Sequence, residues 1–90
     1  MDIVARYVVY ILRSLKDGNL YIGSTNDLAR RLEEHNTGKV PSTKPRRPFV
    51  VIYYEAYRSE SDARKREHNL KLRKRAFAQL RNRLEDSLKS

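Results

Sequence analysis

The 90 residues suit one domain, because a second independent core would have too little apolar surface to bury. The chain has no cysteine, which excludes a disulfide scaffold, a thiolate zinc site and a cysteine nucleophile, and no apolar stretch approaches the roughly 18 residues of a membrane span. A net charge of +9, from 20 basic and 11 acidic residues, makes a polyanion such as nucleic acid the expected partner.

These properties predict a single domain over residues 1–90 that uses neither a membrane nor a small-molecule cofactor. The first residues lack the basic flank and apolar stretch of a secretory signal, so a cytoplasmic location is the default expectation. We expect a monomer.

A β-hairpin is the first predicted feature. Residues 6–13 are β-branched and aromatic and apolar on both alternating faces, which predicts a buried strand. Asp17-Gly18 offers a two-residue turn, because glycine accepts positive φ without steric cost, and residues 20–23 are then the returning strand.

The register of this hairpin decides which side chains share a face. With a two-residue turn, Ser14 pairs with Tyr21. Tyr10 lies four residues before Ser14 and therefore on the same face. The register thus predicts that Tyr10 and Tyr21 point the same way.

A helix from Asp27 to about Asn36 is predicted next, capped by Asn26 or Thr25 and ended by Gly38. In helical projection Arg31 and His35 border the apolar stripe, whereas Arg30 faces water.

The second half of the chain begins with an irregular, proline-containing loop. Residues 49–57 form a third strand of high apolar density. A helix follows from about residue 60 to residue 75, with Ser59 as its cap, and residues 76–88 continue as a second helical segment. On the first of these helices, Glu67 shares one face with apolar side chains.

The positive charge is concentrated in two places. Residues 64–83 hold nine basic side chains and one acid, Glu67, and residues 39–47 hold four basic side chains and no acid. Such clusters bind backbone phosphates, although a solubilising surface would have the same composition. The predicted nucleic-acid contacts are Lys44, Arg46, Arg47, Lys71, Arg73 and Lys74.

Hydrolysis of a phosphodiester needs a deprotonated nucleophile, a cation for the developing charge, and help for the leaving oxygen. A tyrosine acts as general base only if nearby cations pull its pKa down towards neutrality, and Arg31, His35 and a metal ion could supply that field. Glu67 offers an oxygen ligand to a hard divalent cation. The same residues also have structural interpretations, since Glu67 stands four residues before Lys71 and fits an ordinary helix pair. Spacing alone leaves both interpretations open.

Taken in order, Val8-Val9-Tyr10, Tyr21-Ile22-Gly23, Arg31, His35 and Glu67 resemble the GIY-YIG nuclease superfamily. The resemblance runs from about residue 6 to residue 75 and is closest to the short stand-alone members. This chain has Val8-Val9 where the name-giving motif has Gly-Ile, and Ser24 where some relatives have a lysine.

The resemblance implies an α+β fold in which helices flank a three-stranded antiparallel sheet, in the order β-β-α-β-α-α. It implies that Tyr10 is the general base, that Tyr21 orients the water, and that Arg31 stabilises transition-state charge. By the same match, His35 assists proton movement and Glu67 holds one Mg²⁺ or Mn²⁺ ion.

The expected function is therefore metal-dependent endonuclease activity on DNA, in repair or processing. Two alternatives stay open at this stage, namely a non-catalytic nucleic-acid-binding module and an RNA-directed binder or nuclease.

Overall fold

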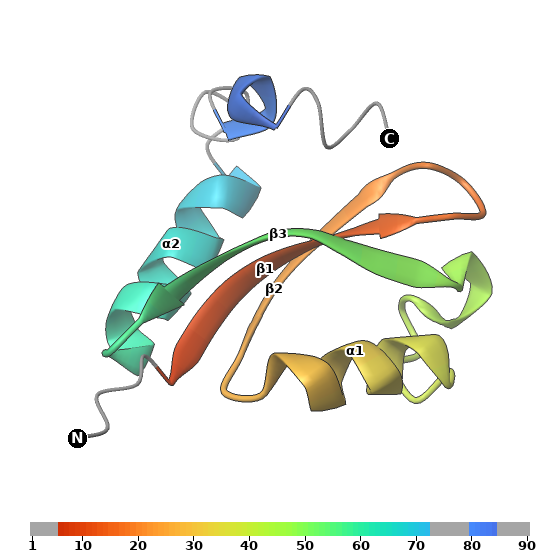
Figure 1. Ribbon diagram of the computed structural model, residues 1–90, viewed down its shortest axis with the longest axis horizontal. Helices are drawn as coiled ribbons and strands as arrows, with labels where there is room; N and C mark the ends of the chain where they lie inside the picture. Colours follow the sequence, from red (N-terminus) through yellow and green to blue (C-terminus); the bar gives the residue numbers. More distant parts are fainter. Residues whose placement is uncertain (1–5, 73–79, 85–90) are drawn as a thin grey trace.

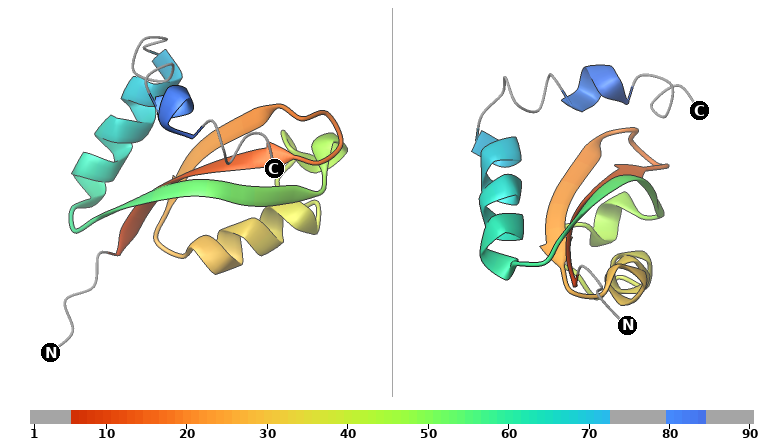
Figure 2. Two further views of the ribbon diagram at one scale, coloured as in Figure 1. Left: turned by 45° about the horizontal axis from the view of Figure 1, so that its top comes forward. Right: turned by 60° about the vertical axis from the view of Figure 1, so that its left-hand side comes forward.

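The computed structural model describes residues 6–72 and 80–84. A three-stranded antiparallel sheet lies between two helices (Figures 1 and 2). The elements follow in the order β1 (Tyr7–Ser14), β2 (Leu20–Thr25), α1 (Leu28–Asn36), a 3₁₀ turn (Lys44–Arg46), β3 (Phe49–Tyr57) and α2 (Glu60–Leu72). A short helical stretch at residues 80–83 follows. The predicted α+β class and element order are confirmed.

β1 is the central strand, because the sheet order is β2-β1-β3. Its side chains alternate between two covered faces, which explains why the strand is apolar throughout. Val9 and Ile11 join the core beneath α2, and Tyr10 and Leu12 join the core beneath α1. The view along the sheet shows α1 and α2 on opposite sides of it (Figure 2).

The hairpin differs from its predicted register by two residues. Leu12, and not Ser14, stands opposite Tyr21, because the turn is a longer loop in which the Gly18 amide donates to the Ser14 carbonyl (2.9 Å). Gly18 has φ +73°, as expected of a glycine that ends such a turn. A shift of two residues preserves the face of every side chain, so Tyr10 and Tyr21 still lie on one side.

Both helix starts have side-chain caps. The predicted cap of α1 was wrong by one or two residues: Asp27 is the N-cap, and its carboxylate accepts from the Arg30 amide (3.1 Å). Gly38 follows the end of α1 with φ +81°. Ser59 caps α2 as predicted, accepting from the Asp62 amide. The predicted continuation of α2 to residue 75, and most of the segment 76–88, lie outside the described residues.

α2 is fastened to β3 by one carboxylate. Arg66 donates to both oxygens of Glu55 (2.8 and 3.0 Å), and the hydroxyls of Tyr53 and Tyr57 each donate to it at 2.7 Å. Burial alone would raise the pKa of Glu55, but these four hydrogen bonds hold it at about 2. The cluster fixes the rotation of α2, and with it the position of the neighbouring residue Glu67.

Within residues 6–72 and 80–84, no helix has the length and apolar character needed to cross a membrane.

Candidate functional site

Tyr10 lies in the middle of the central strand, directly opposite Gly23 on β2. Its side chain is 1% exposed, yet its ring lies over the backbone of Gly23. A Cβ atom at position 23 would stand 2.5 Å from the Tyr10 hydroxyl and 2.6 Å from Cζ. The last residue of the Tyr21-Ile22-Gly23 motif is therefore a glycine because Tyr10 occupies the space of a side chain.

His35 is the hydrogen-bond partner of Tyr10. It lies in the last turn of α1, is fully buried, and places Nε2 3.0 Å from the Tyr10 hydroxyl. Its other ring nitrogen, Nδ1, lies 2.8 Å from the hydroxyl oxygen of Thr43. Three buried side chains from β1, α1 and the loop before β3 thus form one chain of hydrogen bonds.

The Thr43 end of this chain indicates which atoms donate and which accept. When the Thr43 hydroxyl donates to the Val40 carbonyl (3.4 Å), its oxygen is free to accept from Nδ1–H of His35. A neutral imidazole that donates from Nδ1 has its lone pair on Nε2, and the Tyr10 hydroxyl donates to that lone pair. In this tautomer His35 can receive the proton of Tyr10.

The pKa values of this pair fit that direction. Burial lowers the pKa of His35, and the neighbouring Arg31 guanidinium lowers it further, so the imidazole is neutral near pH 7. Burial raises the pKa of Tyr10 to about 12, although Arg31 acts against it. The Arg31 cation alone therefore does not bring the tyrosine pKa towards neutrality, because desolvation outweighs it.

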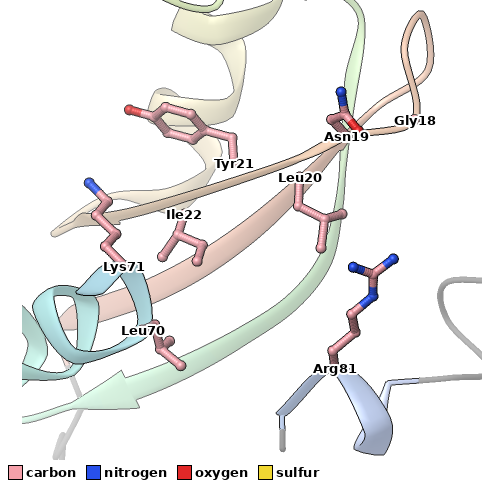
Figure 3. A pocket seen from close by; sticks show the side chains of 8 residues that line it. All are labelled: Gly18, Asn19, Leu20, Tyr21, Ile22, Leu70, Lys71 and Arg81. Carbon is pink, nitrogen blue, oxygen red and sulfur yellow. The ribbon is translucent and has the colours of Figure 1, made fainter. Parts of the chain in front are cut away.

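Tyr21 completes an aromatic cluster on this face of the sheet. Its ring centroid lies 6.4 Å from that of Tyr10 and 4.9 Å from that of His35, the latter in an edge-on arrangement. Tyr21 is half-buried, whereas Tyr10 and His35 are buried. Figure 3 shows its hydroxyl directed away from the strand. Tyr21 is thus the most exposed of the three rings.

The helical projection separates Arg31 from Arg30 as predicted. Arg31 is half-buried and contributes to the electrostatic field at Tyr10, while Arg30 is exposed and donates to Asn26 Oδ1 (3.2 Å). Arg31 Nη1 also donates to Glu34 Oε1 (3.0 Å), a partner that the sequence did not indicate. Glu34 raises the pKa of Arg31 and limits the rotamers that the guanidinium can adopt.

Glu67 approaches β2 from α2. Its Oε1 accepts from the Ser24 hydroxyl and its Oε2 from the Lys71 ammonium (2.7 Å), so the predicted helix pair exists. Burial would raise the pKa of Glu67, but Lys71 and then Ser24 outweigh it, and the pKa lies below its ordinary value. The charge of Glu67 also acts on Tyr10, which places the carboxylate near the aromatic cluster.

The donor set around Glu67 fits a hard divalent cation. It offers one carboxylate and the Ser24 hydroxyl oxygen, and both are oxygen ligands of the kind that Mg²⁺ and Mn²⁺ take. Within the described part of the chain, no group of three His, Cys, Asp or Glu side chains accompanies it. Mg²⁺ characteristically keeps several waters and needs few carboxylates, so this sparse set is compatible with it.

The predicted phosphate contacts differ in the exposure of their side chains and in the partners that these side chains already have. Arg46 pairs with Asp17 (2.8 Å) and lies over the ring of Phe49, so it fastens its loop to the β1–β2 turn. Arg47 is half-buried and donates to the Lys44 carbonyl (2.8 Å). The Lys44 side chain is exposed, and Lys71 carries the ion pair with Glu67. Arg73 and Lys74 lie outside the described residues.

A polar pocket of about 300 Å³ separates the first turns of α1 and α2. Arg30, Arg31 and Arg64 line it together with Ser24, and the acids Glu34 and Glu60 also border it. Arg31 and Ser24 thus connect this concave, cationic surface to the buried cluster behind it.

Three residues of the site were not predicted from the sequence. Thr43 lies eight positions after His35 in an irregular loop, Ser24 stands where some relatives have a lysine, and Gly23 is the last residue of a motif. The only signal for Gly23 was its place two residues after Tyr21 in the motif.

Comparison with known proteins gives concordant results. The family model described as the GIY-YIG catalytic domain matches residues 6–82. A UPF0213 protein of Staphylococcus haemolyticus is 42% identical over 69 residues, 76% of this chain and 83% of the relative. A UPF0213 protein of Staphylococcus aureus is 42% identical over 66 residues, 72% of this chain and 79% of the relative. The solution NMR structure of a UPF0213 protein from Bacillus halodurans is 38% identical and has a TM-score of 0.51, covering 82% of this chain and 80% of that chain.

Proposed function

The chain belongs to the GIY-YIG catalytic domain family, and from this membership we propose that it is a divalent-metal-dependent endonuclease that hydrolyses DNA phosphodiester bonds. The observation that supports the proposal most is the buried hydrogen-bond chain from Tyr10 through His35 to Thr43, whose Tyr10 end interacts with Arg31. Burying three polar side chains costs solvation free energy that apolar side chains of the same volume would not, which favours a role in function.

In the proposed reaction, a water attacks phosphorus while the bond from phosphorus to the leaving oxygen breaks, and the leaving oxygen takes up a proton from solvent water. Tyr10 takes a proton from the water as its own phenolic proton passes to Nε2 of His35, so no free phenolate has to form in a buried site. Thr43 holds the imidazole in the tautomer that can accept this proton. Tyr21 orients the water with its hydroxyl.

Arg31 and Glu67 act on charge. The Arg31 guanidinium, at the wall of the polar pocket, stabilises the negative charge that develops on the phosphoryl oxygens. Glu67 and Ser24 would hold the divalent ion, which supplies Lewis-acid stabilisation of the phosphoryl group when bound. Lys44, Arg47, Lys71, Arg73 and Lys74 are proposed to bind the phosphates on either side, with Arg46 holding the loop in place.

One observation favours a second candidate function, a nucleic-acid-binding module without catalysis. Lys71 already pairs with the carboxylate that the metal would need. A module of this kind would bind DNA through the same cationic surface and show no cleavage.

Glu67→Gln separates the two functions, and Glu60→Gln is its matched control. Both glutamates lie on α2 and both form an i,i+4 pair, Glu67 with Lys71 and Glu60 with Arg64. If the proposal is right, Glu67→Gln abolishes Mg²⁺-dependent plasmid nicking, whereas Glu60→Gln keeps it. Both variants should melt close to the wild type, because an exposed or half-exposed pair contributes only about 0–1 kcal/mol.

DNA binding in chelator should persist in Glu67→Gln, since the change removes a negative charge next to the phosphates. Nicking by the wild type that survives excess chelator, or that Glu67→Gln leaves intact, contradicts the metal role. A wild type that binds DNA and cuts no supercoiled, branched or single-stranded form supports the binding module.

A further inference from the structure

Both carboxylate oxygens of Glu67 already accept a hydrogen bond. Ser24 donates to Oε1 from β2, and the Lys71 ammonium donates to Oε2 (2.7 Å) from the next turn of α2. The two donors differ in what they could offer to a metal ion. The hydroxyl oxygen of Ser24 can ligate a hard cation, whereas an ammonium has only donors and a positive charge.

Lys71 and a divalent ion therefore compete for this carboxylate. Glu67 carries a single negative charge, and the ammonium already neutralises it. A dication on the same carboxylate would stand within a few ångströms of the ammonium, and like charges repel more strongly where water is partly excluded. The Glu67 side chain is only 20% exposed, so the surrounding water screens this repulsion poorly. Lys71 has to leave before the ion can be held tightly.

The surroundings of Lys71 leave it room to move. Its side chain is 46% exposed, and its ammonium sits at the end of a flexible aliphatic stem. It lines a pocket of about 470 Å³ beside β2, together with Ile22 and Leu70. In Figure 3 its ammonium is directed away from these two apolar side chains. The ammonium can therefore change its partner without disturbing the core.

A nucleic-acid phosphate is the partner that would draw Lys71 away. Lys71 is one of the cations that the proposed function assigns to phosphates, and a second cation, Arg81, lines the same pocket. A phosphate carries a full negative charge and is a strong acceptor for an ammonium. On DNA, the release of condensed counterions adds to this attraction, and the pair with Glu67 has no such contribution. Binding of substrate thus frees the carboxylate.

We propose that Lys71 gates the metal site. Without substrate its ammonium holds Glu67, and a substrate phosphate withdraws it so that Glu67 and Ser24 can hold the divalent ion. The inference rests on the proposed function, because it assumes a nucleic-acid substrate and a metal ion at Glu67. Metal and DNA then bind cooperatively, and each raises the affinity for the other by the same factor. The protein holds its metal tightly only where a strand is present.

The first measurement is the affinity for Mn²⁺ without DNA, from electron paramagnetic resonance of the unbound ion. Lys71→Met keeps the aliphatic stem and removes the ammonium, so it should bind Mn²⁺ about fivefold more tightly than the wild type. This factor corresponds to about 1 kcal/mol, the upper end of the range for an exposed ion pair. A melting curve checks that the variant is folded.

Arg64→Met is the matched control for the loss of a positive charge. Arg64 also lies on α2, where it hydrogen-bonds Glu60 (3.2 Å) and acts on the charge of Glu67 through space. If Lys71 occupies the metal site, only Lys71→Met shows the fivefold gain, and Arg64→Met changes the Mn²⁺ affinity by about twofold or less. Equal gains in the two variants would mean that net charge is the whole effect, and would overturn the inference.

The second measurement follows the ion pair itself by NMR, in chelator, while a DNA duplex is added. The carboxyl resonance of Glu67 should shift in the wild type as its pair opens, and hardly in Lys71→Met, where no pair remains to open. The pair of Glu55 with Arg66 serves as an internal control, because two tyrosine hydroxyls also hold that carboxylate, and its resonances should stay in place.

A Mn²⁺ affinity that Lys71→Met leaves unchanged overturns the inference. A Glu67 resonance that stays in place while the wild type binds DNA overturns it as well, as does the same shift in Lys71→Met. Neither measurement depends on cleavage. A protein that gives both expected results and never nicks DNA would keep this gate and lose the proposed enzymatic function, whereas one that nicks DNA with Mg²⁺ and gives neither would keep the function and lose the gate.

Discussion

Gly23→Ala is the substitution whose effect the structure determines best. The new Cβ would lie 2.6 Å from Cζ of Tyr10, whereas carbon atoms in contact are normally 3.5–4.0 Å apart, so the ring must retreat by about 1 Å. Tyr10 is 1% exposed, so its ring is enclosed by protein. The hydrogen bond from its hydroxyl to His35, now 3.0 Å long, is the contact that this movement breaks.

The magnitude follows from these distances. Forcing one extra methyl group into a packed core costs about 1–3 kcal/mol of the free energy of unfolding. A displacement of about 1 Å at a reacting group lowers the rate by roughly 10²-fold. We therefore expect Gly23→Ala to fold with a lowered melting temperature and to lose about two orders of magnitude in the rate of Mg²⁺-dependent nicking.

Gly18→Ala provides the matched control. Gly18 has φ +73°, so alanine there adopts a left-handed conformation at a cost of roughly 1–2 kcal/mol, and no atom lies within 4 Å of the added Cβ. Both variants should lose similar stability in a melting experiment, and only Gly23→Ala should lose nicking. Retention of wild-type nicking by Gly23→Ala would refute the role that we assign to the position of Tyr10.

Three further predictions concern individual side chains. Arg31→Ala should lower the nicking rate by roughly 10²-fold or more, as for loss of one transition-state donor, while Arg30→Ala changes it little; equal losses would contradict the inward placement of Arg31. Thr43→Val should lower the nicking rate about tenfold or more, and Thr43→Ser, which keeps the hydroxyl, should retain it. NMR of the imidazole nitrogens of His35 should show the Nδ1–H tautomer only when residue 43 has a hydroxyl. The pKa of Glu55 is about 2 in the folded protein against an ordinary 4.5. The contribution of ionised Glu55 to the free energy of unfolding is therefore complete above pH 4.5 and is lost as the pH falls towards 2. The wild type should therefore exceed Glu55→Gln by about 3 kcal/mol in unfolding free energy at pH 7, and the two should converge in acid; a difference that does not depend on pH would exclude this explanation.

The fold was predictable because its main signals are local and redundant. The buried strand from Tyr7 to Ser14 is recognisable in the sequence by its apolar residues on both faces. The third strand was predicted with its observed bounds. The hairpin register was predicted two residues out, since a glycine turn does not specify its own length. The shared face of Tyr10 and Tyr21 survived this error because strand geometry depends on odd or even spacing alone.

The details of the candidate site depend on contacts between distant segments, which a single sequence does not encode locally. Thr43 orients His35 from an irregular loop with no periodicity, so nothing in the chain marked it as a partner. Arg46 and Lys44 look alike in a count of charges, yet Arg46 is paired with Asp17 over the Phe49 ring. Counting cations locates a basic segment, and only packing shows which of its members are free to meet a phosphate.

Glu67 has two interpretations, an ordinary helix ion pair and a metal ligand. Both rest on the need of a mostly buried carboxylate for a nearby cation. The exposed pair of Glu60 with Arg64 needs no explanation beyond helix spacing, since both side chains are more than half exposed. The Glu67 side chain is only 20% exposed, accepts from Ser24 as well, and acts on the buried Tyr10. A carboxylate in such a place requires a compensating cation. Lys71 meets that requirement with a single charge on a flexible, half-exposed stem, and a divalent ion would meet it with two. The ion pair is therefore the form that this carboxylate takes beside a lysine, and a divalent ion would have to displace Lys71 to take its place.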